Sequence, residues 1–348
     1  MYYFDGWSGP LTNNGFHGMV NGPYQGREPV TGWQDNSSCA VEQQLAWAHS
    51  FGIDFFVFDW YYNGTIYDPA ALDLDSALKI THSLPDRHGM QYALLFIDDP
   101  PFVNSAADWP PIINQWMDYM TDPAYVKVNG KPLLIIIDMG AMRNLFGSSA
   151  GVAGALNQLR AAAQTHGLPG VFVVGVFGEP LGSSGQDAQF PDLSWMQNDG
   201  YDALSTYNYP FIPPPVNGML PFSSLSAAGH WIWSECALKC PLPAIPVAMD
   251  GWDPRPWNEM APNGDLVWFS RTPQDVASHV GDTIAAANAN PRLRVEPAPA
   301  PPMVLIEAWN ELGEGSYLVP TVGDGSSYGD SLSGLLGGPS SATRVRSR

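Results

Sequence analysis

The sequence alternates short apolar runs with longer amphipathic segments, and this alternation restricts the fold more than any other feature. Eight runs have the length and composition of β-strands, at residues 2–5, 53–59, 92–97, 133–137, 171–176, 203–206, 245–249 and 303–309. Residues 53–59 are almost wholly apolar, as expected for a parallel strand covered on both faces. Helical segments separate most of the runs. The pattern therefore predicts an α/β protein with a single-domain (β/α)8 TIM barrel over residues 1–336, rather than an open doubly wound sheet.

Helix start and stop signals support this assignment. Ser38 can cap a helix that Gly52 closes, and Thr272 with Pro273 opens another. The helices are expected near residues 38–51, 73–83, 109–120, 151–164 and 223–234, from residue 272 onward, and near Leu332. The Gly-rich and Ser-rich stretch at residues 337–348 predicts a disordered tail.

Charge and aromatic content narrow the class of partner. The chain has 34 Asp and Glu against 15 Lys and Arg, a formal net charge of −19, which disfavours nucleic acid and anionic membrane surfaces. No apolar run is long enough to span a membrane. Aromatic residues make up 12% of the chain, and flat aromatic faces beside carboxylates suit sugar rings. We expect a monomer that binds an oligosaccharide or polysaccharide.

The cysteines and the first residues of the chain give less information about function. Cys236 and Cys240 are close enough to pair if the backbone allows it, whereas Cys39 is left over as a small helix residue. The three Cys and seven His show no metal-binding spacing, so no metal or other cofactor is expected.

The chain opens on a strand-like run without a signal-peptide pattern. It is expected to be cytoplasmic, or secreted or periplasmic if a signal peptide was removed.

Nearly every predicted strand ends in an acid, an aromatic residue or both. These ends carry Asp59 with Trp60 and Tyr61, Asp98, Asp138, Glu179, Tyr207 with Asn208 and Tyr209, Asp250 with Trp252, and Glu311. In a closed barrel the carboxyl ends of the strands meet at one mouth, where barrel enzymes carry their sites. One Asp at a strand end is ordinary turn chemistry, and Asp138 in particular suits a scaffold role. The repetition of acidic and aromatic residues at the strand ends predicts a functional site at this mouth of the barrel.

The strongest candidate site follows the last predicted strand, where Glu311 and Glu314 stand three residues apart. Alternation from Leu305 places Glu307, Trp309 and Glu311 on one face of that strand. Burying an unpaired carboxylate costs roughly several kcal/mol, so these acids need an explanation. One is a surface loop in which they cap a following helix. The other is a catalytic pair that splits a glycosidic bond, one carboxyl as acid and one as base or nucleophile.

The residues around the pair resemble a known signature. The sequence A-W-N-E-L-G-E-G, ending at Gly315, is similar to the N-E-W-x-E-G motif of family 99 glycoside hydrolases and of the related WbsX-like domains. The opening Tyr-Tyr-Phe run and residues 27–29, 32–33, 52–61 and 251–257 also resemble that group, in the same order. Leu312 stands where the family has Trp, which implies a different floor to the −1 or −2 pocket. The resemblance implies a (β/α)8 fold and a retaining, endo-acting enzyme for α-linked mannose glycans.

The resemblance also implies roles for the pair. Glu311 would deprotonate the sugar 2-hydroxyl, which attacks its own anomeric carbon to give a 1,2-anhydro sugar. Glu314 would be the general acid that later activates water. Other expected substrate contacts are the hydroxyl and stacking groups of Tyr207 and Tyr209, Trp252 as a sugar platform, Asn310 orienting a hydroxyl, and Arg255 holding a carboxylate such as one of the two Glu. Asp59, Trp60, Tyr61, Asp98, Glu179, Asn208 and Asp250 complete the expected set, with Asp59 and Asp250 either binding sugar hydroxyls or bracing Trp60 and Arg255.

Two other functions remain open at this point. A WbsX-type glycosyltransferase in polysaccharide synthesis would need a pyrophosphate site, for which Asp73 with Asp75 and Asp98 with Asp99 are the candidates. A barrel that binds carbohydrate without cleaving it would not need both Glu311 and Glu314.

Overall fold

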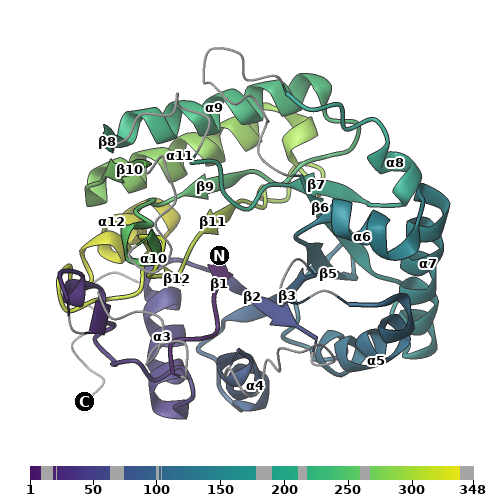
Figure 1. Cartoon of the computed structure of the whole chain (residues 1–348), viewed down its shortest axis with the longest axis horizontal. Helices are drawn as coiled ribbons and strands as arrows, with labels where there is room; N and C mark the ends of the chain where they lie inside the picture. Colours follow the sequence, from purple (N-terminus) through teal and green to yellow (C-terminus); the bar gives the residue numbers. More distant parts are fainter. Residues whose placement is uncertain are drawn as a thin grey trace.

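The computed structural model describes residues 1–8, 19–20, 22–62, 74–98, 102, 104–177, 190–210, 218–258 and 267–337. It contains a curled, mainly parallel sheet with helices around its outside (Figure 1). The strands follow the order β1-β2-β3-β5-β6-β7, with β4 antiparallel to β5. Their bounds are β1 (Tyr2–Tyr3), β2 (Phe55–Tyr61), β3 (Gln91–Ile97), β4 (Lys127–Val128), β5 (Lys131–Ile136), β6 (Phe172–Val176) and β7 (Ala203–Ser205).

Further hydrogen bonds continue the curl of this sheet. Strand β9 (Val247–Met249) pairs in parallel with β11 (Leu305–Glu307). Leu204 in β7 forms a bridge with Ala244, just before β9. After β11, the Trp309 backbone N–H donates to the Tyr2 carbonyl across 2.8 Å. Each of the eight predicted strand regions contains a strand, so the α/β class with a curled parallel sheet is confirmed.

The helices cover the outer face of the sheet. They are α3 (Ser38–Phe51), α4 (Ser76–Ser83), α5 (Trp109–Met120), α6 (Met139–Phe146), α7 (Ser149–Thr165), α8 (Met196–Asp199), α9 (Phe222–Lys239), α10 (Arg255–Asn258), α11 (Pro273–Ala289) and α12 (Ser327–Leu336), with short 3-10 turns η1 (Gln25–Arg27), η2 (Ala106–Asp108) and η3 (Pro291–Leu293). Helix α3 ends where predicted because Gly52 adopts the left-handed conformation, with φ 88°. Helix α11 opens after Thr272 as predicted, and Thr272 and Asp275 cap each other reciprocally there.

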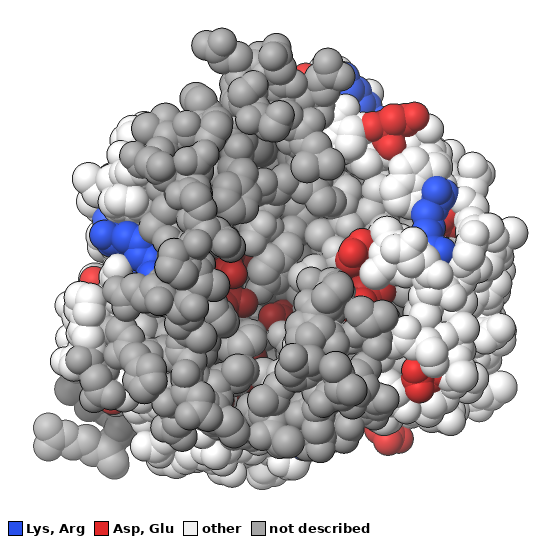
Figure 2. All heavy atoms as spheres, in the orientation of Figure 1, with Lys and Arg blue, Asp and Glu red and all other residues white. Residues whose placement is uncertain are grey.

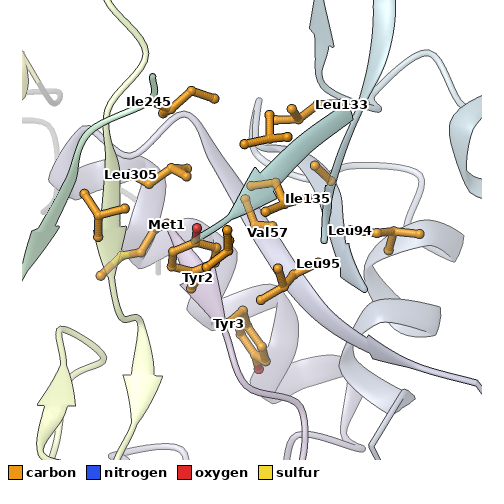
Figure 3. Close-up of a cluster of buried hydrophobic side chains, with 14 of the residues drawn as sticks. Met1, Tyr2, Tyr3, Val57, Leu94, Leu95, Leu133, Ile135, Ile245 and Leu305 are labelled. Atoms are coloured by element: carbon orange, nitrogen blue, oxygen red, sulfur yellow. The ribbon is translucent and has the colours of Figure 1, made fainter. Parts of the chain in front are cut away.

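Inside the curled sheet, the inward-facing side chains form an apolar layer, with acidic side chains above it at the carboxyl ends of the strands. Figure 3 shows Tyr2, Val57 and Ile135 among the buried side chains that meet there, all of them fully buried. Residues two apart on a strand share a face. Asp59 therefore lies above Val57, on the carboxyl side of the apolar layer, and a carboxyl reaches the same interior from each of several strands.

The end of the last strand differs from the sequence prediction. Strand β11 stops at Glu307, so the alternation does not continue to Trp309. The Trp309 indole instead turns toward α3, where its Nε1 donates to Gln44 Oε1 across 2.8 Å and its ring packs 5.2 Å from Phe56. Glu307 and Trp309 therefore do not share a face, because a side chain that leaves the strand no longer follows its period.

The sequence also missed several elements, among them one helix and two strand pairs. Helix α6 begins directly after Asp138, whose Oδ1 accepts from the backbone N–H groups of Gly140 and Ala141 at 2.6 and 3.0 Å. This agrees with the scaffold role suggested for Asp138. The other two are the parallel pair β8 (Gly218–Pro221) with β10 (Val267–Ser270), and the antiparallel hairpin β12 (Asn310–Glu311) with β13 (Ser316–Tyr317).

Three smaller points complete the fold. Cys236 and Cys240 form a disulfide near the end of α9, whereas Cys39 lies in α3, as predicted, but is exposed. Among the helices that the structure describes, none combines the length and apolarity needed to cross a bilayer. The predicted tail lies outside the described residues from residue 338 onward, as does Glu179.

Candidate active site

The two motif carboxylates lie on the β12–β13 hairpin that follows β11. Glu311 is the last residue of β12, and the backbone N–H of Glu314 donates to the Glu311 carbonyl across 3.1 Å in the turn. Gly315 has φ 75° and lies against Asp253, so that an added Cβ would stand 2.7 Å from the Asp253 backbone nitrogen. Only glycine fits there without a shift. The turn therefore fixes the spacing of the two Glu side chains.

The hairpin is held from the amino-terminal side of the chain. The Asn310 side chain accepts from the Phe4 backbone N–H at 2.9 Å and donates to the Phe4 carbonyl at 2.8 Å. The Trp7 indole Nε1 donates to the Asn310 carbonyl at 2.7 Å, and Arg27 Nη1 donates to the Leu312 carbonyl at 2.8 Å. The Asn310 amide therefore joins the hairpin to the residues after β1, a structural role that stands beside the expected one of orienting a sugar hydroxyl.

Glu311 lies in a buried but hydrogen-bonded position. Its Oε1 accepts from the Tyr207 hydroxyl across 2.9 Å, and 6% of the residue is exposed. Burial raises the pKa of Glu311 to about 7, although the hydrogen bond from Tyr207 opposes the shift by favouring the charged form. A carboxyl with this pKa is divided between its two protonation states near neutral pH, which suits proton transfer.

Glu314 lies in a less favourable environment for a charge. The side chain is half-buried, and its Oε2 has no hydrogen-bond partner among the described residues. Burial, and then the neighbouring charge of Glu311, raise the pKa of Glu314 well above its ordinary value. Of the two, Glu314 therefore holds its proton more strongly and Glu311 ionises first.

Further acids lie close to the pair. Asp59, at the carboxyl end of β2, is buried, and its pKa is raised by burial and by the charges of Glu311 and Glu314. Glu307, the last residue of β11, is fully buried, and burial followed by the charge of Asp250 raises its pKa well above the ordinary value. Figure 2 shows acidic side chains in the central hollow of the face seen in Figure 1. The sequence had given Glu307 no role, although its place two residues after Leu305 indicated an interior position.

Several of the expected site residues come together and others do not. The residues that approach the carboxylate pair are Asp59 and Tyr207. The predicted stacking role of Tyr209 is wrong because its hydroxyl contacts His279 Nε2 at 2.8 Å in the core. Trp60 is likewise no open platform, since it is buried against Trp116 at 5.5 Å between ring centroids.

The remaining candidates have other neighbours. Arg255 does hold a carboxylate, but it is that of Asp253, with Nε 2.6 Å from Oδ1, and not either Glu. Asp250 is fully buried and lies 3.6 Å from Arg271, so it braces Arg271 rather than Arg255. Tyr61 is half-buried, and its ring lies 4.4 Å from that of Phe102 at a tilt of 53°. Asn208 is half-buried, and Trp252 is buried with 6% exposed. Asp98 lines a cavity of about 390 Å³ with Asn104 and Asp138.

Arg27 and Asp253 were given no role, although both lie within segments that the sequence singled out. Arg27 forms an ion pair with Asp253 and donates to its carbonyl across 3.0 Å. The Asp253 backbone N–H in turn donates to the Glu314 carbonyl. These bonds support the turn that carries the pair. Among the described residues, no group of three or more His, Cys, Asp and Glu side chains could hold a metal ion.

Three solved structures resemble this fold at low sequence identity. A "glycoside hydrolase-like protein" is 15% identical with a TM-score of 0.60, over 89% of each chain. The GH99 endo-α-mannosidase from Bacteroides thetaiotaomicron is 16% identical with a TM-score of 0.58 in complex with BIS-TRIS-propane, over 92% of this chain and 86% of that one. A second structure of that enzyme is 14% identical with a TM-score of 0.55, over 92% and 87%. At these identities the likeness shows the fold alone.

Two comparisons by sequence give different results. No curated protein matches the chain. A family model described as "Glycosyltransferase WbsX" matches residues 102–331. Since that match covers more than half of the sequence, the chain belongs to the WbsX family.

Proposed function

We propose that this protein is a retaining glycoside hydrolase that cleaves α-linked, mannose-like glycans, with Glu311 and Glu314 as its catalytic carboxylates. The observation that carries the proposal is the pair's unequal environment at the carboxyl end of the sheet. Glu311 accepts a hydrogen bond from Tyr207 and has a pKa of about 7, whereas Glu314 Oε2 accepts none from the described residues and the pKa of Glu314 is raised well above its ordinary value. Glycosidases need one carboxyl that is ionised and one that is protonated at the same pH, and environments that separate the two pKa values supply this.

In this mechanism Glu311 acts as the base. Its ionised carboxylate takes the proton of the sugar 2-hydroxyl, and the resulting oxygen attacks the anomeric carbon to form a 1,2-anhydro sugar. Glu314 gives its proton to the departing glycosidic oxygen. Ionised Glu314 then takes a proton from water, and the water oxygen attacks the anomeric carbon and breaks its bond to the 2-oxygen. Glu311 returns its proton to the released 2-oxygen. Two inversions at one carbon leave its configuration unchanged, and both Glu residues end as they began.

The proposal includes a closed (β/α)8 barrel, which would bring the carboxyl ends of the strands together around the pair. The Leu204–Ala244 bridge and the hydrogen bond from Trp309 to Tyr2 support closure, since they lie at the two joins of the sheet. In such a barrel the site belongs at the mouth formed by the strand ends. Asn208 and Asp98 are the remaining candidates there for contacts to sugar hydroxyls.

The family description favours a second candidate function, a glycosyltransferase. Of the acids suggested for its pyrophosphate site, Asp73 and Asp99 lie outside the described residues, and Asp75 lies 2.5 Å from Lys79 in an ion pair. A titration of the protein with UDP-sugars and GDP-sugars, with and without Mg²⁺, separates the two functions. The hydrolase proposal predicts no saturable binding, whereas micromolar binding would favour the transferase.

The hydrolase proposal is tested by supplying glycans to the purified wild-type chain. The panel contains α-mannans, α-glucans, and fucose-rich and rhamnose-rich polymers, and product release is followed by reducing-end assay. We expect cleavage of an α-linked, mannose-containing polymer, with ¹H NMR showing that the first product formed keeps the α configuration. Release of a β product, or no cleavage of any polymer, would contradict the proposal.

A further inference from the structure

A polar cavity lies at the carboxyl ends of β3 and β5, apart from the two Glu residues of the hairpin. It has a volume of about 390 Å³, and five of the residues around it have polar side chains: Asp98, Asn104, Ser105, Asp138 and Asn144. The rest of its wall is apolar and comes from η2 and α6. Pockets that bind small molecules have volumes from about 300 Å³ upward, so this cavity has room for a ligand of the size of one sugar ring.

The register of the sheet brings Asp98 and Asp138 to neighbouring positions. Phe96 in β3 pairs with Ile136 in β5, and the Ile137 backbone N–H donates to the Phe96 carbonyl across 3.1 Å. Each Asp follows the paired residue of its own strand by two positions, on two strands that lie next to each other (Figure 1). Adjacent strands are about 4.8 Å apart. The two acids therefore belong to one site.

Two side-chain oxygens of this site are available to a ligand. Asn104 is 8% exposed, and its Nδ2 donates to the Phe102 carbonyl across 3.1 Å, whereas its Oδ1 has no hydrogen-bond partner among the described residues. Asp138 caps α6 with Oδ1 alone, which leaves its Oδ2 for another donor. A buried acceptor without a donor is unfavourable. A ligand with hydroxyl groups would supply the missing donors.

The composition of the wall indicates the class of ligand. The described residues that line the cavity include no Lys, Arg or His, so an anionic ligand would meet carboxylates without a compensating charge. A bound Ca²⁺ needs several oxygens that converge at about 2.4 Å, and no group of three or more acids or His is placed for this in the described part of the chain. Neutral hydroxyl groups can donate to the carboxylates and accept from the Asn amides. A sugar residue offers this combination.

The cavity lies within reach of a glycan bound at the pair of Glu311 and Glu314. Asp59, whose pKa is raised by burial and by the charges of that pair, is level with Leu95, three residues before Asp98. Strands β3 and β5 are the next two after β2 in the sheet. With about 4.8 Å between strands and about 3.3 Å per residue, the cavity lies roughly 10–15 Å from Asp59. Only an oligosaccharide can occupy both places at once.

We propose that this cavity is a distal subsite that binds one sugar residue of the glycan through Asn104, Asp138 and Asn144, so that long chains bind more tightly than short ones. Its part in the reaction rests on the proposed function, because the glycan is taken to be the one that the Glu pair cleaves. Asp98, which the sequence placed among the substrate contacts, belongs to this subsite rather than to the place of cleavage.

The test uses two neighbouring exposed alanines of η2, of which Ala106 lines the cavity and Ala107 does not. Ala106→Trp fills the cavity, and Ala107→Trp is the matched control. Each is combined with Glu314→Gln so that the glycan is not consumed, and α-linked mannobiose and mannohexaose are titrated by calorimetry. We expect Ala106→Trp to weaken mannohexaose binding about tenfold, as for the loss of one or two hydrogen bonds, and to leave mannobiose binding unchanged. Ala107→Trp should change neither.

A second variant tests the wall without filling it. Asn144→Leu removes a polar group from the exposed surface of α6, and Asn157→Leu, at an exposed position of α7, is its control. The same selective loss of mannohexaose binding is expected in Asn144→Leu alone. Equal mannohexaose affinities in Ala106→Trp and Ala107→Trp would overturn the proposal. So would equal losses for the short and the long sugar, no binding of either sugar to Glu314→Gln, or binding of Ca²⁺ that Asp98→Asn abolishes.

The subsite and the proposed function can fail separately. If the wild type cleaves a glycan and Ala106→Trp keeps the same preference for chain length, the proposed function stands and the subsite is rejected. If the wild type cleaves nothing but mannohexaose binding is selectively lost in Ala106→Trp, the subsite stands and the hydrolase is rejected.

Discussion

The Tyr207 hydroxyl donates to Glu311 Oε1 across 2.9 Å, although 104 residues separate the two in the sequence. Tyr207→Phe removes this bond while keeping the ring. Because the bond favours the ionised carboxylate, the pKa of Glu311 rises above about 7, by about one unit for a hydrogen bond to a charged group. The acidic limb of the pH profile of kcat/KM then moves to higher pH. Tyr119→Phe, in α5, is the control, and a limb that stays in place in Tyr207→Phe would contradict the assignment of Glu311 as base.

Asn310 joins the hairpin to the residues after β1 through two hydrogen bonds to Phe4. Asn310→Ala leaves the Phe4 backbone N–H and carbonyl without their partners in a buried position, which costs about 2–3 kcal/mol in the free energy of unfolding. Urea denaturation measures the loss. Asn208→Ala, at a half-buried neighbour of Tyr207, is the comparison, with an expected change under about 0.5 kcal/mol. Equal losses in the two variants would show that the bonds to Phe4 carry no special weight.

Arg27 and Arg255 both pair with Asp253 but differ in burial, since their side chains are 9% and 37% exposed. Arg27→Met removes an ion pair and two bonds to backbone carbonyls under the turn that carries Glu311 and Glu314. We expect it to lower the free energy of unfolding by about 3 kcal/mol, against less than about 1 kcal/mol for Arg255→Met. Thermal and urea unfolding provide the comparison. A larger loss in Arg255→Met would reverse this account of how the hairpin is held.

His279 makes stability depend on pH. Burial lowers the pKa of His279 from 6.5 to about 3, while its ring contacts Tyr209 and Ser226 at 2.8 and 2.9 Å. Between pH 6.5 and 3 the unfolded chain binds a proton at this residue and the folded chain does not. Its contribution is therefore complete above pH 6.5 and is lost as pH falls, by about 1.4 kcal/mol per pH unit.

The matched variant is His279→Gln, which cannot titrate. All other ionisable groups are common to both proteins, so the difference between their pH–stability curves isolates His279. Between pH 3 and 6.5 the free energy of unfolding of the wild type should change more steeply with pH than that of the variant. The difference in slope corresponds to one bound proton, about 1.4 kcal/mol per pH unit. Parallel curves would mean that His279 is protonated in the folded protein.

The fold was largely predictable because each parallel strand is a local apolar run and each main helix has its own boundary residues. Helix α5 has the predicted bounds, Trp109–Met120. The predictions that failed concern residues beyond a strand end, where the direction of the side chain no longer follows the strand alternation. Trp60 was expected at the mouth and Trp309 on the same strand face as Glu311, yet both turn outward beneath helices. Nothing in the residues next to them distinguishes the two directions.

The same distinction applies to the site. Glu311 and Glu314 were found from local spacing and residue type, whereas the partners of the polar residues around them come from distant segments. Tyr207 and Tyr209 are two residues apart, but Glu311 receives the first hydroxyl and His279 the second. Such choices depend on packing between elements far apart in the chain, which a pattern along the sequence does not specify.

The central claim is that Glu311 and Glu314 are both catalytic, and the most direct measurement is kcat/KM of Glu311→Gln and Glu314→Gln on the glycan that the wild type cleaves. Each Gln keeps the size of the side chain and removes its ability to exchange a proton, so each variant should lose at least about 10²-fold. Glu42→Gln, at an exposed acid in α3, should match wild type. Activity within tenfold of wild type in either Glu311→Gln or Glu314→Gln, with a folded protein, would contradict the claim.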